Sequence, residues 1–142
     1  MLKGVPSIIS PELLYALSQM GHGDELVIAD GNFPCHSVGK NSIVIRADGH
    51  GVPEILDAVL KLIPLDTYVE SPAMLMATAK DDPTPEIWAK YEDIITKNNG
   101  ETNISQIERF KFYERTREAY AVIATSESAL YANIILKKGV VK

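Results

Sequence analysis

Hydrophobic and polar positions along the chain follow two alternating patterns. In three stretches, apolar residues recur every three to four positions, which is the spacing of an amphipathic helix. These stretches begin near Pro11, Pro53 and Pro85, and proline suits the first turn of a helix. Each stretch is followed by glycine or proline, residues that end helices. Three helices are therefore predicted, over residues 11–20, 52–63 and 85–98.

Short apolar runs between these helices have the length of buried strands. Five strands are predicted, over residues 26–29, 43–45, 73–77, 119–125 and 133–136. Ser105 followed three residues later by Glu108 fits a capping box, which predicts a fourth helix from Ser105 to about Arg117. A loop is expected over residues 31–41. Helices that alternate with strands predict an α/β fold: a single domain over residues 1–142, layered α/β/α around a central sheet.

The composition is that of an ordinary globular protein. The chain has 142 residues, of which 46% are hydrophobic and 23% charged, and this length supports one hydrophobic core. The net charge of −5 gives no electrostatic footprint for nucleic acid or an anionic membrane surface, so neither partner is expected. No apolar run approaches the ~20 residues that span a bilayer, and no targeting segment is evident. A cytoplasmic location is the default expectation.

Cysteine and histidine are too few and too scattered to suggest a metal site. Cys35 is the only cysteine, so neither an intrachain disulfide nor a cysteine-rich zinc site can form. His22, His36 and His50 lack the spacing of known zinc motifs, and no metal is expected. Cys35 and His36 are adjacent in an extended segment, where their side chains point apart. A packed cysteine is therefore favoured over a thiol nucleophile.

Two titratable residues flank the first predicted strand. His22 stands between two glycines, which would let a ligand approach the backbone closely, although a histidine on a surface turn is the simpler interpretation. Asp30 ends the strand where α/β folds often bind ligands, although it could equally form an Asx turn. The strand would separate the two by about 20 Å. If both serve one ligand, either the glycine segment folds back or a second subunit completes the pocket.

Three further segments carry polar side chains whose role is weighed against a structural one. Arg109 falls in the first turn of the predicted fourth helix, where the helix dipole opposes a cation, and this hints at a use outside the helix. Tyr131, Ala132 and Asn133 offer a stacking face, a hydroxyl and an amide, which suit a sugar, while turn formation explains Asn133 equally well. Tyr120 lies in a predicted buried strand and is expected to belong to the core.

Together, these segments resemble the family of L-fucose mutarotases, which is related to the ribose pyranases. The most specific are Gly-His-Gly-Asp at residues 21–24 and Arg-Phe-Lys-Phe-Tyr-Glu-Arg at residues 109–115, and the second favours the fucose branch. Tyr-Ala-Asn at residues 131–133 is instead the form associated with ribose pyranases. The resemblance covers the chain from end to end, through residues 2–4, 11–14, 20–25, 30, 32–34, 45–49, 109–115 and 131–140.

This resemblance implies a cofactor-free isomerase that acts on the anomeric carbon of a free monosaccharide. It implies that His22 donates a proton and that Asp30, Arg109 and residues 131–133 bind the sugar. It also implies a homo-oligomer, commonly a decamer, with active sites at subunit contacts. A histidine can donate and accept protons at neutral pH, as ring opening and closing require.

Ring opening also needs a second acid or base. Tyr131 and Tyr120 are the two candidates for it, and Tyr131 is favoured. L-fucose mutarotation is the leading hypothesis for the function. A D-ribose pyranase-type isomerase and a non-catalytic sugar-binding oligomer are the alternatives.

Overall fold

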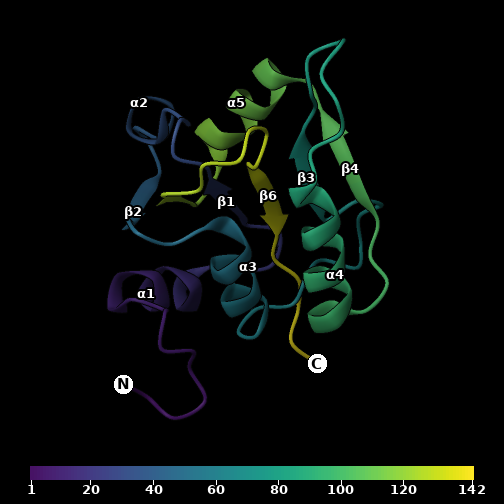
Figure 1. Cartoon of the computed structure of the whole chain (residues 1–142). Helices are drawn as coiled ribbons and strands as arrows, with labels where there is room; N and C mark the ends of the chain where they lie inside the picture. Colours follow the sequence, from purple (N-terminus) through teal and green to yellow (C-terminus); the bar gives the residue numbers. More distant parts are fainter.

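A six-stranded mixed sheet organises the chain in the computed structural model, which describes residues 1–142 (Figure 1). Helices and strands alternate along most of the sequence, as the hydrophobic pattern predicts. In chain order the elements are α1 (Pro11–Gln19), β1 (Glu25–Ala29), α2 (Cys35–Val38), β2 (Ile43–Ala47), α3 (Val52–Leu60), β3 (Ala73–Met76), α4 (Ile87–Asn99), β4 (Ile104–Ile107), α5 (Arg109–Glu118), β5 (Ala121–Thr125) and β6 (Ile134–Lys137).

The strand order is β2-β5-β1-β6-β3-β4, and β6 alone runs against the others. Strand β1 pairs in parallel with β5 and antiparallel with β6, which in turn pairs antiparallel with β3. The first residue of β6 therefore lies beside the carboxyl ends of β1 and β3, at one end of the strands. Figure 1 shows this edge at the top of the molecule, next to α5.

Helices cover both faces of the sheet, so the predicted α/β/α layering is confirmed. The larger apolar cluster has 27 buried residues and joins α1, α3 and α4 to one face. A second cluster of 11 buried residues joins α2 and α5 to the other face. Strand β1 serves both clusters, because successive side chains alternate across a strand: Leu26 faces the first cluster and Val27 the second. This explains why β1 is apolar at four successive positions, residues 26–29, rather than alternating.

The predicted start of the last helix is wrong. Residues 104–107 form β4, which pairs in parallel with β3 at the edge of the sheet. The helix α5 begins only at Arg109, and its cap is Glu108, whose carboxylate accepts hydrogen bonds from the N–H groups of Phe110 and Lys111. The capping-box pattern of Ser105 and Glu108 is a local signal. The pairing of β4 with β3 joins residues distant in sequence, and it overrides that signal.

Two smaller boundaries also differ from prediction. The expected loop over residues 31–41 contains the short helix α2, which packs Cys35 and Val38 into the second cluster. Tyr120 precedes β5 instead of lying within it, and its hydroxyl donates to Gln19 Oε1 at 2.7 Å. Tyr120 is partly buried and packs against the larger apolar cluster, so it lies at the margin of the core. None of the helices combines the length and the apolar character needed to cross a bilayer.

Candidate functional site

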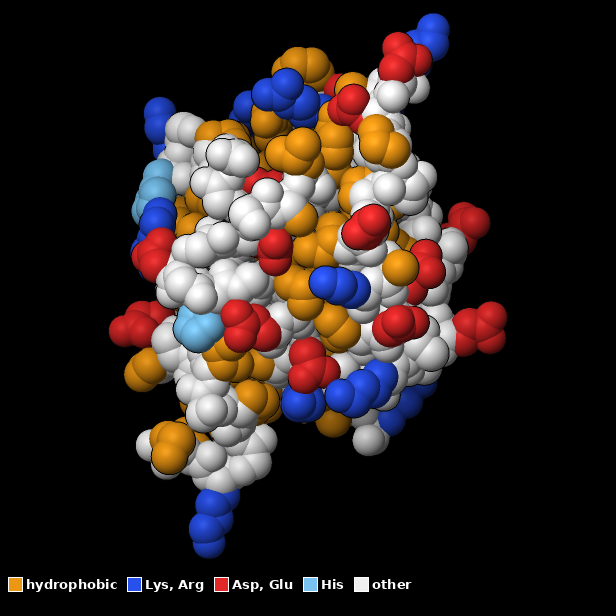
Figure 2. Space-filling view, in the orientation of Figure 1, with side chains coloured by type: hydrophobic (Ala, Val, Ile, Leu, Met, Phe, Trp, Pro, Cys, Tyr) orange, Lys and Arg blue, Asp and Glu red, His pale blue; other side chains and the backbone are white.

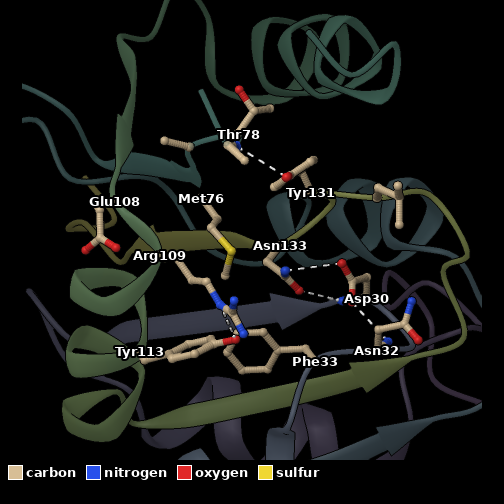
Figure 3. Close-up of a pocket in the computed structure, with 13 residues that line it drawn as sticks. Asp30, Asn32, Phe33, Met76, Thr78, Glu108, Arg109, Tyr113, Tyr131 and Asn133 are labelled. Atoms are coloured by element: carbon tan, nitrogen blue, oxygen red, sulfur yellow. Dashed lines mark hydrogen bonds between the residues drawn. The ribbon is translucent and has the colours of Figure 1, made fainter. Parts of the chain in front are cut away.

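A cavity of about 590 Å³ opens at the sheet edge where β1, β3 and β4 end and β6 begins (Figure 3). Its walls come from the segments after β1 and β3, the start of α5 and the loop before β6. β6 lies between β1 and β3 and runs antiparallel to both. The segments that follow β1 and β3 therefore lie on either side of the loop that enters β6, and the cavity lies among them. The outer ends of strands near such a topological switch are the usual ligand sites of α/β sheets.

Asp30 and Asn133 form a buried pair on the floor of the cavity. The amide oxygen of Asn133 accepts the Asp30 backbone N–H at 2.7 Å, and its nitrogen donates to Asp30 Oδ2 at 3.2 Å. Asp30 Oδ1 accepts the backbone N–H of Asn32 at 3.0 Å. Burial raises the pKa of the Asp30 carboxyl above its ordinary value, although these hydrogen bonds counteract part of the rise. The pair presents an oriented carboxylate to a ligand.

Arg109 brings a positive charge to the same cavity. It is the first residue of α5, and its guanidinium lies beside the Tyr113 ring and points toward Phe33 (Figure 3). Arg109 Nε donates to the Tyr113 hydroxyl at 3.0 Å, and the guanidinium carbon lies 5.4 Å from the centre of that ring. No carboxylate forms an ion pair with it, so its other N–H groups are free to bind oxygen atoms of a ligand.

Tyr131 closes the cavity opposite Arg109 and ties two loops together. Its φ of 54° is in the left-handed region, which is rare for a residue with a side chain. The hydroxyl accepts the Ala79 N–H at 3.2 Å and donates to the carboxylate of Asp82. From behind, Trp88 Nε1 donates to the Tyr131 carbonyl at 2.8 Å. Such strain concentrates at functional sites, where neighbouring contacts hold it in place.

Ala132 does not line the cavity, unlike the four other predicted binding residues, Asp30, Arg109, Tyr131 and Asn133. It is fully buried, and its carbonyl accepts the Tyr91 hydroxyl at 2.7 Å. Ala132 thus anchors the segment that carries Tyr131 and Asn133.

His22 lies at the other end of the sheet, away from this cavity. It precedes β1, whereas Asp30 follows it, and the five residues of β1 span roughly 17 Å at the usual rise per residue. His22 Nε2 lies 2.9 Å from Asp66 Oδ1, so the carboxylate that contacts His22 in this chain is Asp66 and not Asp30. Tyr120 also lies at this end. One chain therefore does not unite His22 with the predicted sugar-binding residues.

The cavity also contains residues that were missed from the sequence. Tyr113 follows Arg109 by four positions on α5, and this helical spacing could have identified it as a contact of Arg109. Phe33 and Met76 supply apolar wall, and no pattern in the sequence marks them. Asp66 and Asp82 come into contact with His22 and Tyr131 only through the fold, across 44 and 49 positions respectively.

Neither Cys35 nor any of the three histidines lines this cavity. Cys35 is buried in the second apolar cluster, and burial raises the pKa of its thiol to about 11. His36 contacts Arg46 and not Cys35. No group of three or more His, Cys, Asp and Glu side chains is arranged to hold a metal ion.

Comparison with known proteins gives one consistent family. Residues 3–141 match the model of the RbsD / FucU transport protein family. The human protein named fucose mutarotase is 55% identical over 145 residues, covering 98% of this chain and 94% of the human protein. The crystal structure of FucU from Bifidobacterium longum is 56% identical with a TM-score of 0.95, covering 99% of this chain and all of that chain.

A crystal structure of the fucose mutarotase from Streptococcus pneumoniae in complex with L-fucose is 48% identical with a TM-score of 0.93. The match again covers 99% of this chain and 100% of that chain. Likeness in sequence and in structure thus extends over the whole fold, including the cavity and the His22 end. The chain belongs to the RbsD / FucU transport protein family.

Proposed function

We propose that this protein is an L-fucose mutarotase, an isomerase that interconverts the α and β anomers of L-fucopyranose. The full-length likeness to a fucose mutarotase that holds L-fucose is the observation that carries this proposal. The cavity is consistent with it, because it combines polar groups for sugar hydroxyls with an apolar wall. L-fucose is a 6-deoxy sugar, and its methyl group packs favourably against such a wall.

Three groups in the cavity suit a sugar ring. The Asp30 carboxylate accepts hydrogen bonds from hydroxyl groups, and the Arg109 guanidinium donates to ring or hydroxyl oxygens. Asn133 keeps the carboxylate oriented through its two hydrogen bonds. Because these partners are already fixed by the fold, little ordering is needed when the sugar binds.

Mutarotation needs only proton transfers and a rotation. A proton leaves the C1 hydroxyl, the ring oxygen gains one as the bond from C1 to the ring oxygen breaks, and the open aldehyde rotates about C1–C2 before closing on the other face. We assign His22 as the proton carrier. Tyr131, whose hydroxyl donates to Asp82, is the better candidate for the second group. The Tyr120 hydroxyl is engaged by Gln19 at the other end of the sheet.

The separation of His22 from the cavity points to a site shared between two copies of the chain. His22 of one copy would complete the cavity of a neighbour in a homo-oligomer, for which the family resemblance suggests a decamer. Exposed apolar side chains occur at both ends: Phe110 and Leu130 near the cavity, and Tyr68 beside His22. Contact between the two ends would remove this apolar surface from water.

The substrate assignment is tested by saturation-transfer NMR on equilibrated sugars. With L-fucose, we expect the protein to accelerate exchange between the two anomers, and His22→Ala to abolish the acceleration. With D-ribose, exchange between pyranose and furanose forms is the matched measurement. Ribose exchange without fucose exchange would identify a ribose pyranase instead. Sugar binding without any exchange would identify a non-catalytic sugar-binding protein.

A further inference from the structure

We propose that Asp82 is a positioning residue that makes Tyr131 a base: Asp82 takes the proton of the Tyr131 hydroxyl while that hydroxyl takes a proton from the sugar. This inference rests on the proposed mutarotase function and deepens it, because it assigns a role to a carboxylate that does not line the sugar cavity. Together the two residues form a proton relay out of this cavity. The hydrogen bond from Tyr131 to Asp82 carries the inference.

A single turn brings both partners of the Tyr131 hydroxyl into place. Residues 79–82 form this turn between β3 and α4, and the Asp82 N–H closes it by donating to the Ala79 carbonyl at 3.0 Å. The Ala79 N–H donates to the Tyr131 hydroxyl at 3.2 Å, and the hydroxyl donates to the Asp82 carboxylate (Figure 3 draws the first of these bonds). The turn therefore fixes a donor and an acceptor around one oxygen atom.

These two partners decide what the Tyr131 hydroxyl can do. Asp82 is exposed and is a carboxylate at neutral pH, which only accepts hydrogen bonds, whereas the Ala79 N–H only donates. The hydroxyl hydrogen of Tyr131 therefore points to Asp82, and Ala79 occupies one lone pair of the oxygen. The other lone pair is left free. Toward a sugar, this hydroxyl can accept a proton but has none to donate.

Helix α4 holds the backbone of Tyr131 from the other side. Trp88 Nε1 donates to the Tyr131 carbonyl at 2.8 Å, and the Tyr91 hydroxyl donates to the Ala132 carbonyl at 2.7 Å. These contacts hold Tyr131 in its left-handed conformation, with φ of 54°. The ring thus has little freedom to turn away from Asp82, and a fixed donor–acceptor pair is what proton transfer requires.

Asp82 is free to receive a proton and to release it. Its side chain forms no ion pair, and the Tyr131 hydroxyl is its only hydrogen-bond donor within the chain. It lines a second cavity of about 450 Å³, whereas Tyr131 lines both cavities. The other charged groups around the second cavity are Glu86, Lys90 and Glu127. A proton that reaches Asp82 has therefore left the sugar cavity and can exchange with water.

The relay accounts for one of the two proton transfers of ring opening. The Tyr131 oxygen takes the proton of the C1 hydroxyl as its own proton passes to Asp82. The C1 oxygen becomes the aldehyde oxygen, the bond from C1 to the ring oxygen breaks, and its electron pair stays on the ring oxygen. The ring oxygen takes a proton from protonated His22, and ring closure reverses these transfers. Tyr131 with Asp82 thus serves the C1 oxygen, and His22 serves the ring oxygen.

The first test removes the charge of Asp82 and keeps its shape. Asp82→Asn can still accept a hydrogen bond from Tyr131 but does not take its proton. We expect kcat for fucose exchange to fall at least about 10-fold, toward the 10²–10⁴-fold typical of general acid–base catalysis, while KM changes little. The matched control is Asp81→Asn, because Asp81 is also exposed and makes no side-chain hydrogen bond or ion pair. It should retain wild-type kcat.

The second test asks whether Asp82 acts through Tyr131. Tyr131→Phe should lower kcat at least as far as Asp82→Asn does. The double variant Tyr131→Phe, Asp82→Asn should be no slower than Tyr131→Phe, because a relay that has lost its first member has no use for its second. A further loss of about 10-fold in the double variant would show that Asp82 acts independently of Tyr131, and this would overturn the relay.

The third test replaces the carboxylate from solution. Asp82→Ala leaves room for formate in the second cavity, and added formate should restore part of kcat in Asp82→Ala but none in Tyr131→Phe, with sodium chloride at equal concentration as the control. No recovery, or equal recovery in both variants, would overturn the role of Asp82. An active wild type with unchanged kcat in Asp82→Asn would refute the relay and leave the mutarotase function standing. A wild type that does not accelerate fucose exchange would refute that function and the relay with it.

Discussion

Asp30 and Asp66 are both buried aspartates, yet their surroundings shift their pKa values in opposite directions. For Asp30, desolvation in the cavity is the largest influence and raises the pKa. For Asp66, the hydrogen bond from the Tyr68 backbone is the largest influence and lowers it. The first carboxylate is poorly solvated and ready to accept hydrogen bonds from a ligand. The second is a stable negative charge beside His22.

These opposite shifts predict opposite dependences of stability on pH. A raised pKa means that the folded state binds the proton more tightly, so the contribution of Asp30 to stability falls as pH rises from about 3.9, the ordinary value, through the raised pKa. A lowered pKa means the reverse, so the contribution of Asp66 is full above about 3.9 and is lost as pH falls through the lowered value.

Urea unfolding of Asp30→Asn and Asp66→Asn over this pH range checks the prediction. With rising pH, the free energy of unfolding of wild type should decrease relative to Asp30→Asn and increase relative to Asp66→Asn. The same sign for both variants would contradict the assignment of either burial or hydrogen bonding as the dominant influence.

At the level of elements, the start of α5 connects the sheet to the cavity. Strand β4 ends at Ile107, Glu108 caps the helix, and Arg109 follows as the first helical residue. A cation is unfavourable at this end of a helix dipole, but the Glu108 carboxylate satisfies the free N–H groups and offsets the charge. The Glu108 cap thus offsets the cost of placing the Arg109 guanidinium at the cavity wall.

Removing this cap should weaken both the helix and the site. We expect Glu108→Ala to lower the free energy of unfolding by about 1 kcal/mol, the usual loss for a helix N-cap, and to raise KM for fucose because Arg109 is less well held. Glu108→Gln is the control, since its side-chain oxygen can still accept from the Phe110 N–H. Urea unfolding and exchange kinetics measure the two effects. An alanine variant as stable as wild type would show that the cap is dispensable.

At the level of the whole molecule, the candidate residues are divided between the two ends of one sheet. The cavity with Asp30 and Arg109 lies at one end, and His22 with Asp66 lies at the other. Figure 2 shows hydrophobic side chains gathered at the upper end of the molecule, among basic side chains. If both groups act on one sugar, as proposed, a second copy of the chain must bring its His22 to the cavity.

Complementation between two inactive variants tests the shared site. His22→Ala and Arg109→Ala should each lose fucose exchange when expressed alone. Co-expressed in equal amounts, they should regain activity at about a quarter of the sites, because a site that draws His22 from one copy and Arg109 from another is intact when both donors are unmodified.

Co-expression of two Arg109 variants, Arg109→Ala and Arg109→Lys, is the control and should give no recovery beyond the sum of the two alone. Sedimentation velocity under the assay conditions should give an oligomer. A fully active monomer, or the absence of recovery in mixed oligomers of the first pair, would contradict the shared site.

Several features could be predicted from local patterns. Helices α1, α3 and α4 have an apolar stripe and clear ends. Each of the strands β1 and β5 contains four consecutive apolar residues, so local signals and tertiary packing agree. Strand β4 was missed because it is short, lies at the sheet edge and contains a sequence that also fits a helix cap. Pairing with β3 decided its conformation.

The candidate site was predictable to the extent that its residues stand at element ends. Asp30 and Arg109 were identified because a polar group after a buried strand and a cation at a helix start are locally unusual. Asp66 has no such local signal and was missed. Tyr113 was also missed, although it follows Arg109 by four positions on a predicted helix. Tyr120 was assigned to the core; it packs partly buried against the larger apolar cluster, and its hydroxyl reaches Gln19 at the surface.

The amino-acid sequence by itself determined the layered α/β fold, because periodicity and helix or strand ends depend on neighbours in the chain. Its motifs also determined the family through their resemblance to known members, and that resemblance implied the candidate residues. Only the tertiary structure decided which of these residues meet. The reversed β6 opens the cavity between β1 and β3, and the β6 end brings Asp66 to His22. Such contacts join residues more than 40 positions apart, and their geometry follows from strand order and register, which no local pattern encodes.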